Sequence, residues 1–298
     1  MNKDSRILKL ICLILIIISL LFGAVTSWIY FGEINAAKIK ILKILPYPVA
    51  LVNGRPILMK SFLRRLELSQ AFEKKQNYND TLTELEKNVL HRMIAEEESM
   101  QLAEEKHLGI NEQELQSEFN NIENEYNKKH SEPLSSALSG FGTSPEEFKK
   151  DILKPNIISA KLATWHNEQE ALNTEAYAEA DKIRLKLKNG ETFEKLVAAY
   201  SQDPAGKQVE GDSGFVESVN LLAEIRSGLK DASEGEVRLI ATRDGLLLIK
   251  LEEKTNSPLA NSQRLHLREI FIKTSDFNSW LEQETSNASI KTYFNFKY

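Results

Sequence analysis

An uncharged, apolar run from Leu10 to Phe31 near the N-terminus constrains this chain more than any other feature of its sequence. A helix of about 20 such residues crosses the hydrocarbon core of a bilayer, so the run is long enough to span a membrane once. Lys3, Arg6 and Lys9 precede the run and favour an N-terminus that stays in the cytoplasm. The run therefore predicts a single-pass membrane segment.

A cleavable signal peptide is the alternative interpretation of this segment. Its apolar core would be shorter and would end at a small-residue cleavage site, which Gly23 to Ser27 match only loosely. We expect residues 1–32 to form a cytoplasmic stub and a membrane anchor, with residues 10–31 in the bilayer. Residues 33–298 would then be extracytoplasmic and tethered to the cell membrane.

The composition excludes several classes of function. A net charge of -5 and a pI near 5.7 argue against a nucleic-acid partner, because phosphate contacts need clustered Lys and Arg. Cys12 is the only cysteine, so the chain has no intramolecular disulfide and no Cys-based metal cluster. The histidines show no metal-ligand spacing such as HExxH, and no glycine-rich phosphate-binding motif is present. We therefore expect no cofactor and no metal site.

After the anchor, the sequence has the pattern of a short hairpin followed by helices. We expect residues 33–47 to be a juxtamembrane linker. Asn53-Gly54 is a tight-turn pair between two short apolar strands. Apolar residues at helical spacing follow, and Ser144-Pro145-Glu146-Glu147 signals another helix start. These patterns predict a helical region over residues 48–172.

Three runs stand out within this region: VALVNGRPILMKSFLRRLE from Val49, VLHRMIAEEESMQLAEEKHLGINEQEL from Val89 and SPEEFKKDILKPNIISAKL from Ser144. In this order they resemble the N-terminal chaperone region of SurA/PrsA-type foldases. The resemblance implies an extracytoplasmic protein whose helices cradle unfolded clients. The alternative is a plain helical bundle whose apolar stripes fill only its own core.

The second half of the chain has the pattern of a small α+β domain. A helix is predicted over residues 174–188, closed by an Asn-Gly pair. Two strands, residues 237–241 and 246–251, are joined by Arg243-Asp244-Gly245, which favours a hairpin turn. These elements predict a second domain over residues 173–274 with a small antiparallel sheet.

The stretch from Ala178 to Glu253 carries a helix ending in NG, an F..L...YS.DP run, a GD.G loop and GEV before a strand. In this order these motifs are similar to those of the parvulin (PpiC-type rotamase) domain. The family's first strand, with its HILV motif, is missing, but residues 265–273 (LHLREIFIK) look like that strand displaced towards the C-terminus. We expect a circularly permuted parvulin domain in which this last strand takes the first strand's place. The alternative is an incomplete domain whose tail packs elsewhere.

The parvulin resemblance implies peptidyl-prolyl cis–trans isomerisation and assigns candidate site residues. The catalytic candidates are Asp203, at the family's Cys or Asp position, and Glu269, at its first histidine position. Leu247 occupies the second histidine position, so both family histidines are absent. The substrate-binding candidates at family pocket positions are Leu221, Ile225, Ser213, Val216, Asp244 and Leu247.

Several candidates also have a purely structural interpretation. Asp203 is followed by a proline and is then an ordinary turn initiator, and Leu221 and Ile225 fit a hydrophobic core equally well. His266 lies an odd number of residues from Glu269, so it should point to the other face of the strand. If Glu269 lies beside Asp203, the pairing of two carboxylates raises the pKa of one of them.

The sequence leaves hypotheses from different classes open. The first is a membrane-anchored foldase that isomerises and holds unfolded or proline-containing secreted and envelope polypeptides. The second is a non-catalytic chaperone or peptide-binding protein with a degenerate parvulin domain, which the missing histidines favour. A structural scaffold for an envelope complex is a weaker third. Residues 275–298 are predicted to form a helix and an aromatic-rich strand that dock on the chaperone region.

Overall fold

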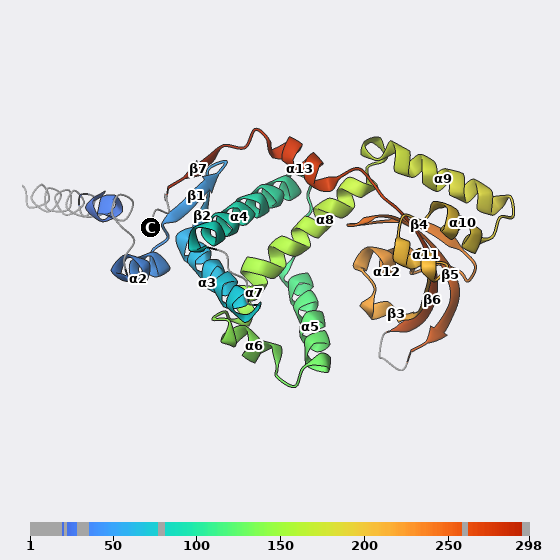
Figure 1. The fold of residues 1–298 in the computed structure, drawn as a ribbon, viewed down its shortest axis with the longest axis horizontal. Helices are drawn as coiled ribbons and strands as arrows, with labels where there is room; N and C mark the ends of the chain where they lie inside the picture. Colours follow the sequence, from blue (N-terminus) through green and yellow to red (C-terminus); the bar gives the residue numbers. More distant parts are fainter. Residues whose placement is uncertain (1–19, 21–22, 29–35, 77–80, 258–261, 294–298) are drawn as a thin grey trace, which may run out of the picture. The chain divides into compact units, whose positions relative to one another are not determined.

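The computed structural model describes residues 20, 23–28, 36–76, 81–257 and 262–293 (Figure 1). No helix within these ranges is both long and apolar enough to cross a bilayer. The greater part of the expected anchor, residues 10–31, lies outside them, as do residues 294–298 of the expected terminal strand.

The chain divides into two compact units, and neither is a single continuous stretch of sequence. The first unit comprises residues 1–98, 112–153 and 287–298, and the second comprises residues 99–111 and 154–286. The sequence-based domain limits, in contrast, follow one another along the chain. The difference arises because helix α4 (Leu82–Glu105) begins in the first unit and ends in the second.

The first unit combines helices with a small sheet of strand order β2-β1-β7. Its strands are β1 (Pro48–Val52), β2 (Arg55–Leu58) and β7 (Ile290–Thr292). Its helices, besides the start of α4, are α2 (Ala36–Ile44), α3 (Met59–Gln76), α5 (Glu112–Lys129), α6 (Leu134–Gly140), α7 (Pro145–Phe148) and the π-helical turn η1 (Lys149–Leu153).

The predicted hairpin of the first unit is present. Asn53 and Gly54 have φ values of 50° and 83°, the positive values that a two-residue hairpin turn requires. On its other edge β1 pairs antiparallel with β7, and Asn53 Oδ1 accepts a hydrogen bond of 2.8 Å from Ser289 N. The C-terminal strand therefore completes the sheet that the first strand begins.

Local sequence signals also start the helices of this unit where expected. Ser144 caps α7, and Glu147 reaches back to the Ser144 backbone N–H, which forms a capping box. Behind the hairpin, Phe62 and Met59 are buried against Val49 and Val52 in one hydrophobic cluster. Apolar burial rather than helix propensity therefore holds these segments together.

The second unit consists of helices around a sheet of strand order β3-β6-β5-β4. Its strands are β3 (Asp212–Glu217), β4 (Val237–Thr242), β5 (Gly245–Asn256) and β6 (Gln263–Ile272). Its helical elements, besides the end of α4, are α8 (Lys154–Glu168), η2 (Glu170–Leu172), α9 (Thr174–Lys188), α10 (Phe193–Tyr200), α11 (Pro204–Gln208), η3 (Ser218–Asn220), α12 (Ala223–Leu229) and α13 (Phe277–Thr285).

Strand β6 lies between β3 and β5 and pairs antiparallel with both. It contains most of the segment expected to replace the missing first strand, and it lies next to β5, the strand that precedes it in the chain. The hairpin expected between β4 and β5 is also present, because Thr242 pairs with Gly245 across a two-residue turn. The domain is thus a mixed fold of helices and antiparallel strands.

The two faces of this sheet pack against different helices. On one face, Leu246, Leu248, Ile270 and Ile272 pack with side chains of α9 and α10. On the other, the alternate residues of β5 and β6 pack with α12; they include Ile249, Leu251, Leu265 and Leu267. Glu269 and Phe271 follow Leu265 and Leu267 at the two-residue spacing of a strand, so they belong to the second face.

A buried polar cluster ties the strand ends to α8. His166 is fully buried, and its ring nitrogens contact Asn167 Oδ1 at 2.9 Å and Ser275 Oγ at 3.2 Å. Asn167 Nδ2 donates to the backbone carbonyl of Thr242 at 2.8 Å. The cluster therefore fixes the end of β4 and the chain just after β6, which flank the cavity described next.

Candidate functional site

A cavity of about 370 Å³ opens where the loop around α11 meets the sheet of the second unit. Apolar side chains form part of its wall, and acidic residues from four different parts of the chain contribute to the rest. The apolar residues are Pro204, Val209, Leu222, Leu247 and Phe271; the acidic residues are Asp203, Asp212, Asp244 and Glu269; Ser201, Gln202, Ser213 and Thr242 also contribute. A concave site with an apolar wall and a few polar groups is typical of ligand binding.

The segment that carries Asp203 is held alongside β6. Gln202 N donates to Phe271 O at 2.8 Å, and the buried Ser201 accepts a hydrogen bond of 3.2 Å from Phe271 N through its hydroxyl oxygen. Asp203 Oδ1 and Oδ2 accept from Ala205 N at 3.0 Å and Gly206 N at 2.9 Å, so Asp203 is the N-cap of α11. The turn-initiator interpretation is therefore correct, and the same carboxylate also lines the cavity.

Glu269 lines the same cavity from β6. Its side chain is half-buried, and desolvation raises the pKa of its carboxyl above the usual range; the nearby negative charge of Asp203 raises this pKa further, and a hydrogen bond from Ser213 opposes both effects. The expected pairing of two carboxylates is thus present, although burial contributes more to the raised pKa than Asp203 does.

Gly211 brings the α11–β3 loop into close contact with Glu269. It has a φ of +75°, and its carbonyl accepts a hydrogen bond of 2.8 Å from Glu269 N. A Cβ atom at this position would lie 2.5 Å from Glu269 O, so only glycine fits. The loop is therefore held directly against the backbone of Glu269, which lines the cavity.

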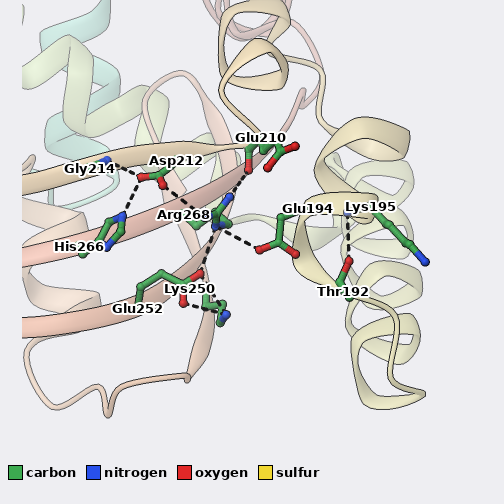
Figure 2. A network of polar contacts seen from close by, with 10 residues as sticks. All are labelled: Thr192, Glu194, Lys195, Glu210, Asp212, Gly214, Lys250, Glu252, His266 and Arg268. Carbon is green, nitrogen blue, oxygen red and sulfur yellow. Dashed lines mark hydrogen bonds and ion pairs between the residues drawn. The ribbon is translucent and has the colours of Figure 1, made fainter.

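A polar network on the opposite face of β6 anchors the same loop (Figure 2). Asp212 accepts hydrogen bonds from His266 at 2.8 Å and Arg268 at 3.3 Å, and Arg268 also donates to the Glu210 carbonyl at 2.9 Å. The hydrogen bond from His266 is the main cause of an Asp212 pKa below the usual range, followed by the Gly214 N–H. His266 thus points away from Glu269, as its odd offset predicts.

The structure brings together five of the candidate residues and leaves three elsewhere. Asp203, Glu269, Ser213, Asp244 and Leu247 all line the cavity. Leu221, Ile225 and Val216 are not among its lining residues; they pack in the hydrophobic cluster under α12, where Ile225 is 6% exposed. The interpretation of Leu221 and Ile225 as core residues therefore describes their contacts, and Val216 packs in the same cluster.

Sequence reasoning missed four apolar residues of the cavity wall, which are Pro204, Val209, Leu222 and Phe271. Leu222, directly after the candidate Leu221, lines the cavity and is 37% exposed. Phe271 lines it from β6, opposite Leu247 in the β5–β6 register. The two-residue spacing from Glu269 was a signal that could have identified Phe271, whereas nothing in the sequence separates Leu222 from Leu221.

Within the described ranges, no group of three or more His, Cys, Asp and Glu side chains is arranged to hold a metal ion. The residues that line the cavity can offer hydrogen bonding, negative charge and apolar contact to a ligand.

Comparisons with known proteins identify both parts of the chain. A family model described as SurA-like N-terminal domain matches residues 1–163, and one described as PPIC-type PPIASE domain matches residues 146–255. The chain therefore belongs to the SurA-like N-terminal domain family and carries a PPIC-type rotamase domain. The rotamase match ends before β6, so Glu269 and Phe271 lie outside it.

Two named relatives cover most of this chain. Chaperone SurA of Pseudomonas fluorescens is 23% identical over 82% of this chain and 66% of its own length, slightly less than two thirds of that protein. Foldase protein PrsA of Clostridium tetani is 21% identical over 80% of both chains.

Crystal structures of PrsA proteins show only a distant likeness. The structure from Bacillus anthracis is 18% identical with a TM-score of 0.22, covering 66% of this chain and 86% of its own. The structure from Lactococcus lactis is 12% identical with a TM-score of 0.29, covering 80% and 84%. At such TM-scores these structures say nothing about the cavity.

Two substitutions distinguish the capping role of the Asp203 side chain from the effect of its negative charge. We expect Asp203→Ala to destabilise the protein by about 1 kcal/mol, because two backbone N–H groups lose their acceptor. Asp203→Asn keeps an acceptor oxygen and should lower the free energy of unfolding much less. Chemical unfolding of both variants measures the difference; equal losses would contradict the capping role.

The raised pKa of Glu269 predicts a pH-dependent stability. A carboxyl whose folded pKa lies above its ordinary value of 4.5 contributes stability that is complete below that value and is lost as the pH rises through the folded pKa. Glu269→Gln cannot ionise, so its stability relative to the native protein should improve between pH 4 and pH 8. Urea unfolding at both pH values tests this expectation. The exposed carboxylate variant Glu282→Gln is the control, and a pH-independent difference for Glu269→Gln would refute the prediction.

Proposed function

We propose that this chain is a foldase that catalyses peptidyl-prolyl cis–trans isomerisation and holds unfolded secreted polypeptides. The observation that carries the proposal is the cavity, in which Asp203, Glu269 and an apolar wall meet in a chain with a PPIC-type rotamase domain. The names of the relatives, chaperone and foldase, support the same conclusion.

The chemistry of prolyl isomerisation suits such a cavity. The barrier to rotation about a peptide bond is about 18–20 kcal/mol and reflects its partial double-bond character. A catalyst needs neither a metal nor a nucleophile; it must hold the proline ring and stabilise the twisted amide. Here Leu222, Leu247 and Phe271 offer apolar contact for the ring, while the hydroxyl of Ser213 and the Glu269 carboxyl offer polar groups beside it.

A non-catalytic peptide-binding chaperone is the second candidate function. It is favoured by Glu269 and Leu247, which stand where the parvulin resemblance implies two histidines. A cavity without those histidines would still hold an extended segment through its apolar wall. Suppression of the aggregation of an unfolded client, without any isomerisation, would favour this candidate.

We expect the purified full-length chain to accelerate cis–trans isomerisation of a short Xaa-Pro peptide above the uncatalysed rate. Leu247→Ala should lower kcat/KM, because it removes apolar surface from the cavity wall. Exchange spectroscopy by NMR measures the rate without a coupling protease.

Leu185→Ala on α9 is the matched control, because that side chain is 59% exposed and lies outside the cavity. It should leave the rate unchanged, and thermal unfolding should show that both variants are folded. Absence of any acceleration by the folded native chain would refute the catalytic proposal and leave the chaperone.

The location of the protein is also part of the proposal. The apolar segment at residues 10–31 and the basic residues before it support a single-pass anchor with residues 33–298 outside the cytoplasm. We expect the native chain to fractionate with membranes and to resist carbonate extraction, and a chain lacking residues 10–31 to be released. Recovery of the native chain in the soluble fraction would refute the anchor.

A further inference from the structure

The charged residues that line the proposed site are all acidic. Among the described residues that line the cavity, Asp203, Asp212, Asp244 and Glu269 are acidic, and none is Lys, Arg or His. Asp203, Asp244 and Glu269 come from the turn before α11, from the β4–β5 turn and from β6, so the acidic residues come from three separate parts of the fold. The Asp212 carboxylate is instead bound by His266 and Arg268 on the opposite face of β6.

Two of these carboxylates are partly offset by cations outside the cavity. Asp212 is bound to His266 and Arg268, which lie on the opposite face of β6 (Figure 2). Asp244 lies 3.7 Å from Arg243, but both side chains are more than half exposed, so water screens this pair.

Asp203 and Glu269 have no such compensation. Asp203 accepts two backbone N–H groups and Glu269 a hydrogen bond from Ser213, and neither forms an ion pair with a cation in the described part of the chain. Neither carboxylate is therefore paired with a cation, and the negative charge of Asp203 makes ionisation of Glu269 less favourable. A cation in the cavity would relieve this repulsion, and an anion would increase it.

The apolar wall and the acidic lining belong to one cavity. Phe271 and Leu247 are cross-strand neighbours, and Glu269 is two residues from Phe271 on the same face of β6. A proline held on this wall would lie in the same cavity as Asp203 and Glu269.

We propose that the cavity selects segments in which Lys or Arg immediately precedes the proline and discriminates against Asp or Glu at that position. This inference rests on the proposed function, because it assumes that the cavity binds prolyl peptides. Complementary charge affects the choice between partners more strongly than it affects the overall affinity. The effect should therefore be seen in the ratio of the affinities for peptides that differ only in this charge.

The test uses the full-length chain and three labelled peptides that differ only before proline: Lys-Pro, Gln-Pro and Glu-Pro. Fluorescence anisotropy gives the dissociation constants, and NMR exchange gives the isomerisation rates. We expect Lys-Pro to bind about tenfold more tightly than Glu-Pro at low ionic strength, with Gln-Pro between them. High salt should shrink the difference, because it screens charges.

Substitutions within the cavity should change the ratio of the Lys-Pro to the Glu-Pro affinity. Glu269→Gln and Asp244→Asn each remove one negative charge at nearly constant volume and should reduce it. Glu282→Gln removes an equal charge from the exposed surface of α13 and should leave it unchanged.

The outcomes separate this inference from the proposed function. Equal affinities, or a preference for Glu-Pro, would overturn the inference even if all three peptides are isomerised. Charge-selective binding without isomerisation would support the inference and refute catalysis. Failure to bind any of the peptides would overturn both.

Discussion

The pairing of β6 with both β3 and β5 is the interaction on which the rest of the second unit depends. It satisfies the backbone N–H and C=O groups of β6 on both sides, and without it β3 and β5 would each present an open edge. The same strand supplies apolar residues to both faces of the sheet. Because its side chains alternate, it also carries Glu269 and Phe271 to the cavity and Arg268 to the network that anchors the α11–β3 loop.

Some acidic residues of the site are explained by the contacts that stabilise the fold, and one is not. Asp203 caps α11 and Asp212 binds Arg268, so both would be explained by structure alone. Glu269 is different, because a half-buried carboxylate beside another carboxylate has a raised pKa and opposes folding at neutral pH. Ionisable groups with perturbed pKa values that lower the stability of the fold concentrate at functional sites. Here that group, Glu269, lies in the wall of a cavity that also offers apolar contact.

Short-range signals predicted much of the fold correctly. Asn53-Gly54 forms a hairpin turn because few residues adopt the positive φ values that such a turn requires, and the predicted Arg243–Gly245 turn is also present. Ser144 starts a helix because its side chain replaces a missing backbone acceptor. The side chains of the site were harder to predict. The resemblance placed Leu221 at the pocket, whereas Leu222 lines it, because a shift of one residue turns a side chain from the core towards the cavity.

The sequence by itself determined the mixed helical and antiparallel fold and the strand of β6, because turn residues, caps and alternation act over a few residues. The class of the protein came from the resemblance of its motifs to known families. The parvulin resemblance also predicted that Glu269 and Leu247 stand at the family's two histidine positions. Only the tertiary structure decided that residues 203, 213, 244, 247 and 269 share one cavity and that Phe271 and Leu222 complete its wall. The physical reason is that these residues meet through strand register and the close approach of Gly211 to Glu269, which depend on contacts between distant parts of the chain.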